Sequence, residues 1–151
     1  MKKVFVVILS LLLTVGCIHK SGTVTPWERV TTENAVLAQS IDTATQGTIA
    51  VQASGLITPQ QAAPVLGYES QVASIQLQLN AILAQAPSAN NIPGIQALVN
   101  QIGAGAQALV STGALGVKNP KSQQTIGADI QAIVSSAELI LSSYQAATGG
   151  K

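Results

Sequence analysis

The chain has few of the side chains that most catalytic and nucleic-acid-binding sites need. It contains one cysteine and one histidine among 151 residues, and aromatic residues make up 3% of it. A single cysteine forms no internal disulfide and no cysteine-rich zinc site. Charged residues make up only 9%, with a net charge of +1, whereas an average soluble domain has about 25%. These values exclude the basic surface that binds nucleic acid.

The few charges are unevenly distributed along the chain. Between Thr43 and Val117 the sequence contains a single charged residue, Glu69. The polar character of this stretch comes from amide and hydroxyl side chains instead. A neutral surface of this kind is better suited to pack against another molecule than to attract a charged substrate.

The first 16 residues form a pattern of their own. Lys2 and Lys3 precede an apolar run over residues 4–13 (VFVVILSLLL), and the small residue Gly16 follows shortly after it. This order is typical of a secretory signal peptide, and the apolar run is too short to span a membrane. We therefore expect residues 1–16 to be removed from the mature protein.

Residues 13–17 (LTVGC) resemble the lipobox of bacterial lipoproteins, with Thr14 where leucine is usual. The resemblance implies that Cys17 is lipidated and becomes the first residue of the mature chain. Ile18 follows the cysteine, where aspartate would retain such a protein in the inner membrane. The resemblance therefore implies an outer-membrane anchor facing the periplasm, with the cell surface as an alternative. Two or three acyl chains anchor a protein stably.

Residues 25–148 predict four helices, over about 26–54, 59–86, 93–113 and 120–147. The Thr-Pro pairs at 25–26 and 58–59 each have Glu or Gln three residues after the threonine, which is a capping box. Asn119 precedes Pro120 as the N-cap of the last helix. Apolar residues recur in each helix at alternating steps of three and four. Pro64, inside the second helix, predicts a kink or a separate short turn.

These stripes and the short loops between them predict an all-α fold, an antiparallel four-helix bundle. Residues 46–55 (QGTIAVQASG) and 104–113 (AGAQALVSTG) are similar, and each leads into a helix that begins with proline. Two tandem copies of one helical hairpin are therefore an alternative description of the bundle. We expect residues 17–24 to form a lipidated linker and residues 149–151 a flexible tail.

Nothing in the sequence combines a nucleophile with a base, a phosphate-binding loop or a metal cluster. We therefore expect no enzyme activity, no cofactor and no metal. His19, in the linker, is expected in solvent, and Glu28 is explained by capping. The remaining acidic residues lie off the apolar stripes and are expected on the solvent-exposed face: Glu33, Asp42, Glu69, Asp129 and Glu138.

Three glycines of the predicted third helix are candidates for close contacts: Gly103, Gly105 and Gly113. A glycine within a helix costs about 1 kcal/mol relative to alanine, so several of them indicate close helix–helix approach. That approach occurs either inside the bundle or with a partner or second copy. Trp27 is expected either to close one end of the core or to contact the membrane interface.

Two tyrosines and two polar residues lie on the predicted stripes. Tyr68 and Tyr144 are expected to place their rings in the core with hydroxyls at its rim. Asn34 and Thr48 interrupt the first stripe. Either they set the register of helix packing, or the first helix is exposed at their levels.

The sequence thus predicts a membrane-anchored envelope lipoprotein, bacterial or prophage-encoded, with a structural or protein-interaction role. Its expected partners are the membrane, through the lipid, and either another protein or a second copy of itself. Two alternatives remain open. One is a membrane-active protein such as a phage lysis or exclusion factor, and the other is a carrier that holds an apolar ligand between its helices.

Overall fold

The computed structural model describes residues 24–111 and 116–149. The predicted signal peptide, Cys17, His19 and Gly113 lie outside these residues, as does the end of the predicted tail. The interpretations that concern them stay predictions.

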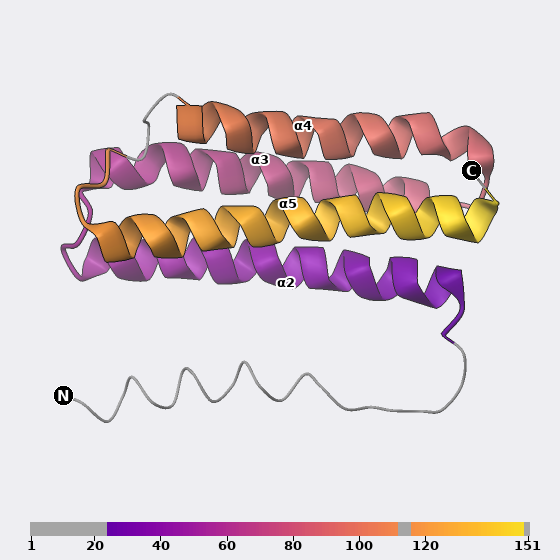
Figure 1. Ribbon diagram of the computed structural model, residues 1–151, viewed down its shortest axis with the longest axis horizontal. Coiled ribbons are helices and arrows are strands. Elements are labelled where there is room, and N and C mark those ends of the chain that lie inside the picture. The colour runs from indigo at the N-terminus through magenta and orange to yellow at the C-terminus, as the bar shows by residue number, and fades with distance from the viewer. Residues whose placement is uncertain (1–23, 112–115, 150–151) are drawn as a thin grey trace.

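The described residues form four α-helices and no strand. The helices are α2 (Pro26–Ala53), α3 (Pro59–Leu83), α4 (Ile92–Ser111) and α5 (Pro120–Thr148), and a short 3-10 helix, η1 (Ala89–Asn91), precedes α4. They run antiparallel along one common direction (Figure 1). This confirms the predicted all-α four-helix bundle. The largest difference in helix bounds is at the end of α3, which stops at Leu83 rather than at 86.

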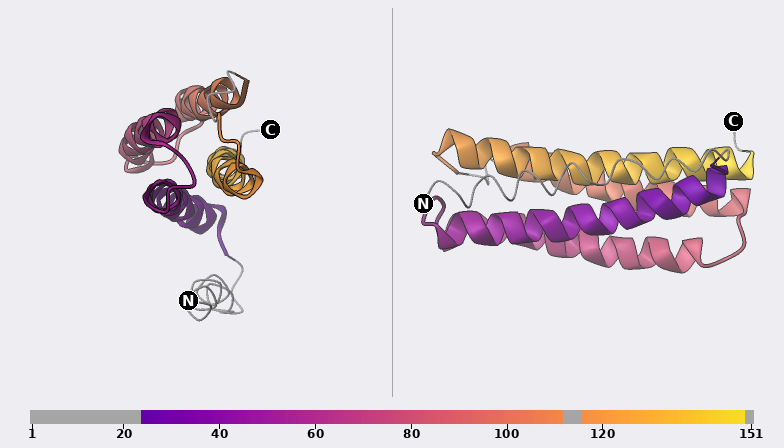
Figure 2. Two further views of the ribbon diagram at one scale, coloured as in Figure 1. Left: turned by 90° about the vertical axis from the view of Figure 1, so that its left-hand side faces the viewer. Right: turned by 90° about the horizontal axis from the view of Figure 1, so that it is seen from below.

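Viewed end-on, the four helices form a ring in the order α2, α3, α4, α5 (Figure 2). Each helix therefore packs against two neighbours, and the pairing of α2 with α5 is the most extensive. The bundle consists of two consecutive hairpins, α2–α3 and α4–α5. We use these names for the two halves below.

The helix starts follow from local capping. The Glu28 amide donates to Thr25 Oγ1 over 3.2 Å, and the Thr25 amide donates to Glu28 Oε2 over 2.7 Å. Thr58 and Gln61 repeat both bonds at the start of α3. Each box satisfies backbone N–H groups that a helix start otherwise leaves without partners.

Pro64 does not form a separate short turn, because α3 is one continuous helix from Pro59 onward. A proline removes the hydrogen bond that its missing N–H would make to the fourth residue before it. Here that loss falls in the second turn of a long helix. The packing of the following residues is sufficient to keep the helix continuous.

The predicted stripes meet along the axis of the bundle. Burial of one large aliphatic or aromatic side chain stabilises the fold by roughly 1.5–3 kcal/mol. The large side chains that solvent does not reach at all come from every helix: Val30, Leu37, Val65, Val72, Leu79, Ile95, Ile102, Ile133, Ile140 and Tyr144.

Trp27 and Tyr144 close the end of the bundle at which α2 begins and α5 ends. Their rings meet edge to face with centroids 6.0 Å apart. The Tyr144 hydroxyl accepts from the Ser88 amide over 3.1 Å and donates to the Ser88 carbonyl over 3.2 Å. Trp27 is half-buried and packs against the core. Its contact with a membrane stays a prediction.

Within residues 24–111 and 116–149, no helix has both the length and the hydropathy that crossing a membrane requires.

Candidate functional site

The two hairpins place their similar sequences at equivalent points of the fold. Gly47 of α2 lies against α5, where an added Cβ would be 3.3 Å from Asp129 Oδ2. Gly105 of α4 lies against α3, where an added Cβ would be 3.1 Å from two ring atoms of Tyr68. Tyr68 and Asp129 each stand tenth in their helices, after Pro59 and Pro120. Contacts thus correspond when α2 is matched with α4 and α3 with α5.

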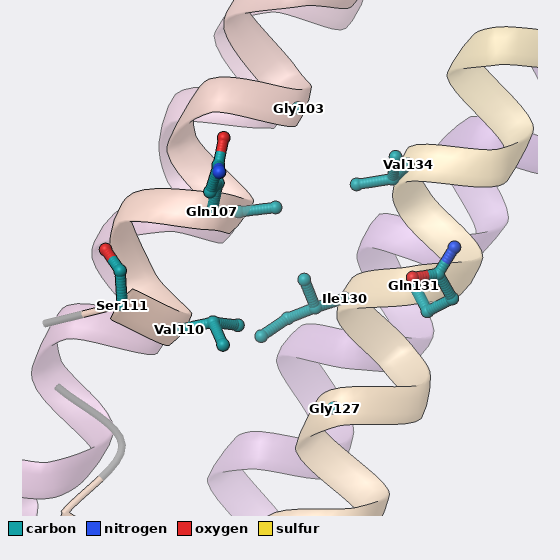
Figure 3. A pocket seen from close by; sticks show the side chains of 9 residues that line it. Gly103, Gln107, Val110, Ser111, Gly127, Ile130, Gln131 and Val134 are labelled. Atoms are coloured by element: carbon teal, nitrogen blue, oxygen red, sulfur yellow. The ribbon is translucent and has the colours of Figure 1, made fainter. Parts of the chain in front are cut away.

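An open groove of about 510 Å³ lies between α4 and α5. Its apolar lining comprises Gly103, Ala106 and Val110 of α4 with Gly127, Ile130 and Val134 of α5. Val110, Ile130 and Val134 point into the space between the helices (Figure 3). The polar lining residues are neutral: Gln107, Ser111 and Gln131.

Two glycines keep this groove open. A Cβ added at Gly103 or at Gly127 would meet no atom within 4 Å, in contrast to Gly105. Packing inside the chain therefore does not require either glycine, although each costs about 1 kcal/mol of helix stability relative to alanine. Gly105 makes the close contact that we expected inside the bundle. For Gly103, contact with a partner stays a prediction.

The equivalent positions of the α2–α3 hairpin carry larger side chains. Thr45 stands where the other hairpin has Gly103, and Leu66 stands where it has Gly127. The pair equivalent to Ala106 and Ile130 is Thr48 and Glu69. Thr48 Oγ1 donates to Glu69 Oε1 over 2.9 Å, inside the bundle.

The expectation that Glu69 and Asp129 lie on the solvent-exposed face is wrong. Glu69 is only 2% exposed, and Asp129 is half-buried. In the ring of helices α3 packs against both α2 and α4, so its buried face is wider than one stripe and includes the neighbour of Tyr68. Glu33 is also half-buried. Asp42 and Glu138 are exposed, as predicted.

The two polar residues on the first stripe both make contacts between helices. Thr48 is buried and bonds to Glu69, and Asn34 Nδ2 donates to Asn80 Oδ1 over 2.7 Å. These contacts tie α2 to α3 at two levels. They support the interpretation that Asn34 and Thr48 set the register of the packing, since a shift of one turn would break both.

The electrostatics around Glu69 favour its neutral form. Burial raises the pKa of its carboxyl, the nearby hydroxyls of Thr48 and Thr45 oppose this rise, and the negative charge of Asp129 adds to it. Burial also raises the pKa of Asp129. Burial and the neighbouring Glu69 raise the pKa of Tyr68 to about 12. Glu69 Oε2 is buried without a hydrogen-bond partner.

The sequence did contain a signal for the buried Glu69 carboxyl. Glu69 is the one charged residue in its long neutral stretch, and it follows a stripe position. On the facing helix, Thr48 places a hydroxyl on an apolar stripe. A hydroxyl opposite a buried carboxyl supplies one of the hydrogen bonds that the carboxyl needs.

The carboxyls of Glu69 and Asp129 do not form a metal centre. Nowhere in the part of the chain that the structure describes do three or more His, Cys, Asp or Glu side chains come together to hold a metal ion. What the arrangement can do chemically is bind a proton.

Comparison of the chain with protein-family models, with curated proteins and with solved structures finds no match in any of the three.

Proposed function

We propose that this chain is a lipid-anchored envelope protein that binds a short apolar helix of a protein partner in the groove between α4 and α5. The anchor rests on the lipobox-like residues that end at Cys17. The interaction role rests on one observation, which is that Gly103 and Gly127 keep the groove open without being needed for packing.

The shape and chemistry of the groove support a helical occupant. Its α4 wall runs from Gly103 to Ser111, a length of about 12 Å at 1.5 Å per residue. A bound helix places its anchors at positions i, i+3, i+4 and i+7, which cover a similar length. The lining contains no charged residue. The partner's anchors are therefore apolar, and its binding depends little on salt.

The groove also lies at a distance from the end of the bundle that carries the proposed tether. Helix α4 begins at Ile92, at the same end of the bundle as the start of α2 (Figure 1). The α4 wall of the groove begins 11 residues after Ile92 and continues toward the opposite end. This places it about 16–29 Å along the bundle from the tethered end. A bundle anchored by Cys17 presents the groove toward the surrounding compartment.

Site-specific photo-crosslinking in the producing cell tests this function. A photoreactive residue at Ser111, on the rim of the groove, is expected to give a discrete protein adduct. Gly127→Leu gives the α4–α5 hairpin the leucine that the α2–α3 hairpin has at Leu66, and it should abolish the adduct. The same photoreactive residue at Leu77, which is 67% exposed on α3, is the position control. If no adduct forms at Ser111, or if Gly127→Leu leaves it unchanged, the proposed interaction is wrong.

The mass of the adduct identifies the occupant. An adduct of twice the chain's mass indicates a second copy, and a lipid adduct indicates the second candidate function, a carrier of an apolar ligand. The volume of about 510 Å³ favours the carrier, because small-molecule pockets measure about 300–1,000 Å³. The anchor has its own test. Cys17→Ser should release the protein from the membrane fraction, and persistence there would refute the anchor.

A further inference from the structure

The Glu69 side chain is an exception within this bundle. Among the buried residues that the structure describes, it is the only one with an ionisable carboxyl, and the others that are polar carry hydroxyls. One of its oxygens accepts from Thr48, and the other, Oε2, has no partner. An unpaired buried carboxylate is among the most destabilising groups a core can contain.

The neighbouring helices supply no positive charge to this carboxyl. Thr45 and Thr48 of α2 approach it with hydroxyls, and Asp129 of α5 approaches it with a second negative charge. Its own helix adds Tyr68, whose phenol stays neutral. No residue of α4 is ionisable. No lysine or arginine occurs in the sequence between Arg29 and Lys118.

Either a proton or a bound cation could remove the excess negative charge, and the geometry favours the proton. Calcium takes 6–8 oxygen ligands, and magnesium needs a near-octahedral shell. Two carboxyl groups and two threonine hydroxyls do not supply such a shell inside a packed bundle. A proton requires only one oxygen, and Glu69 Oε2 is free to take it.

We propose that Glu69 and Asp129 form a proton-dependent switch in the α2–α3–α5 contact. With a proton bound, the pair carries at most one negative charge, and α3 and α5 each pack tightly against α2. When both carboxyls ionise, their repulsion and the burial of two charges loosen this contact. The groove between α4 and α5 has no charged lining residue. The switch therefore does not depend on what the groove binds.

The direction of the pH effect follows from proton linkage. A carboxyl whose pKa is higher in the folded than in the unfolded chain is stabilising below its ordinary value, 4.5 for Glu and 3.8 for Asp. This stabilisation is lost as the pH rises through the higher, folded value. Glu28 acts in the opposite sense, because its capping bonds to Thr25 lower its pKa. Its contribution is present above pH 4.5 and is lost as the pH falls.

Urea unfolding of the full chain between pH 5 and 8.5, followed by circular dichroism, tests the switch. The urea midpoint of the natural chain is expected to fall as the pH rises. Each proton that folding takes up raises the unfolding equilibrium constant by up to about tenfold per pH unit. Glu69→Gln keeps the shape of the neutral acid and should abolish most of this fall. At pH 8 its urea midpoint should be higher than that of the natural chain. Asp129→Asn should reduce the fall.

A matched control and a second measurement complete the test. Glu138→Gln changes an exposed acid on α5 and should leave the pH profile of the natural chain unchanged. Unfolding in weakly buffered solution at pH 6.5 should release more protons from the natural chain than from Glu69→Gln. A urea midpoint of the natural chain that is constant or rises with pH would overturn the proposal. So would a midpoint of Glu69→Gln that falls with pH as much as that of the natural chain. Stabilisation of the natural chain at pH 8 by calcium or sodium, absent in Glu69→Gln, would also overturn it in favour of a bound cation.

Discussion

The seams inside the two hairpins occupy equivalent places but differ in what fills them. The α2–α3 seam contains Thr45 and Leu66, together with the hydrogen-bonded pair Thr48 and Glu69. The α4–α5 seam has Gly103, Gly127, Ala106 and Ile130 at the matching positions, and a groove remains between the helices. Similar backbones thus carry a filled polar contact in one hairpin and an open apolar surface in the other.

The comparison shows that glycines within helices have different structural roles. Gly105 allows α4 to approach the Tyr68 ring, and Gly47 allows α2 to approach Asp129. Gly103 is two residues from Gly105 on the same helix, yet it faces open space. The angular position of each glycine around the helix decides whether its missing side chain serves packing or leaves a surface free.

The largest expected effect comes from giving the open seam the charge of the filled one. Ile130 is 5% exposed, and Ala106 offers no hydroxyl to a carboxyl at its position. Ile130→Glu should therefore lower the free energy of unfolding by about 3 kcal/mol at pH 8, because it buries an unpaired charge. The loss should be smaller at pH 5, because a buried carboxyl takes up a proton more readily at lower pH. Urea unfolding at both pH values measures it. Adding Ala106→Thr should restore part of the stability, and failure to do so would contradict the equivalence of the seams.

A smaller loss is expected from filling the close contact on the other face of α4. Gly105→Val adds atoms where Tyr68 ring carbons lie 3.1 Å from the Cβ position. The ring has little room to move because its hydroxyl donates to the Ile102 carbonyl over 3.3 Å. Overpacking of this kind destabilises by about 2 kcal/mol, measurable as a lower thermal midpoint. A midpoint equal to that of the natural chain would show that Tyr68 yields, and that the contact is not tight.

The smallest expected effect is a gain in stability on closing the groove. Gly127→Leu should raise the free energy of unfolding by about 1 kcal/mol, because leucine favours helix over glycine and no atom opposes its Cβ. The exposed Gly67 of α3 also has nothing within 4 Å. Gly67→Ala is therefore the matched control. Its free energy of unfolding should rise by a similar amount, because alanine also favours helix over glycine, and the groove is not affected. A destabilised Gly127→Leu would contradict the account of an open, unneeded space.

Much of the fold could be predicted because its signals are local. The N-caps at Thr25, Thr58 and Asn119 depend on residues two or three positions away in the chain. The apolar stripes depend only on the 3.6-residue period of a helix. The candidate sites could be predicted only in part. Gly103 and Gly105 were both singled out by composition, but nothing local distinguishes the one that packs from the one that opens a groove.

The four helices, their starts, their apolar faces and the near absence of charge all follow from local sequence, since each of these is a property of one segment. The tertiary structure decided which off-stripe residues are buried and which small residues face open space. Burial depends on the angle at which a residue meets every neighbouring helix. Glu69 lies inside because α3 is flanked by two helices in the ring, and the groove exists because the α4–α5 seam has glycine where the α2–α3 seam has threonine and leucine.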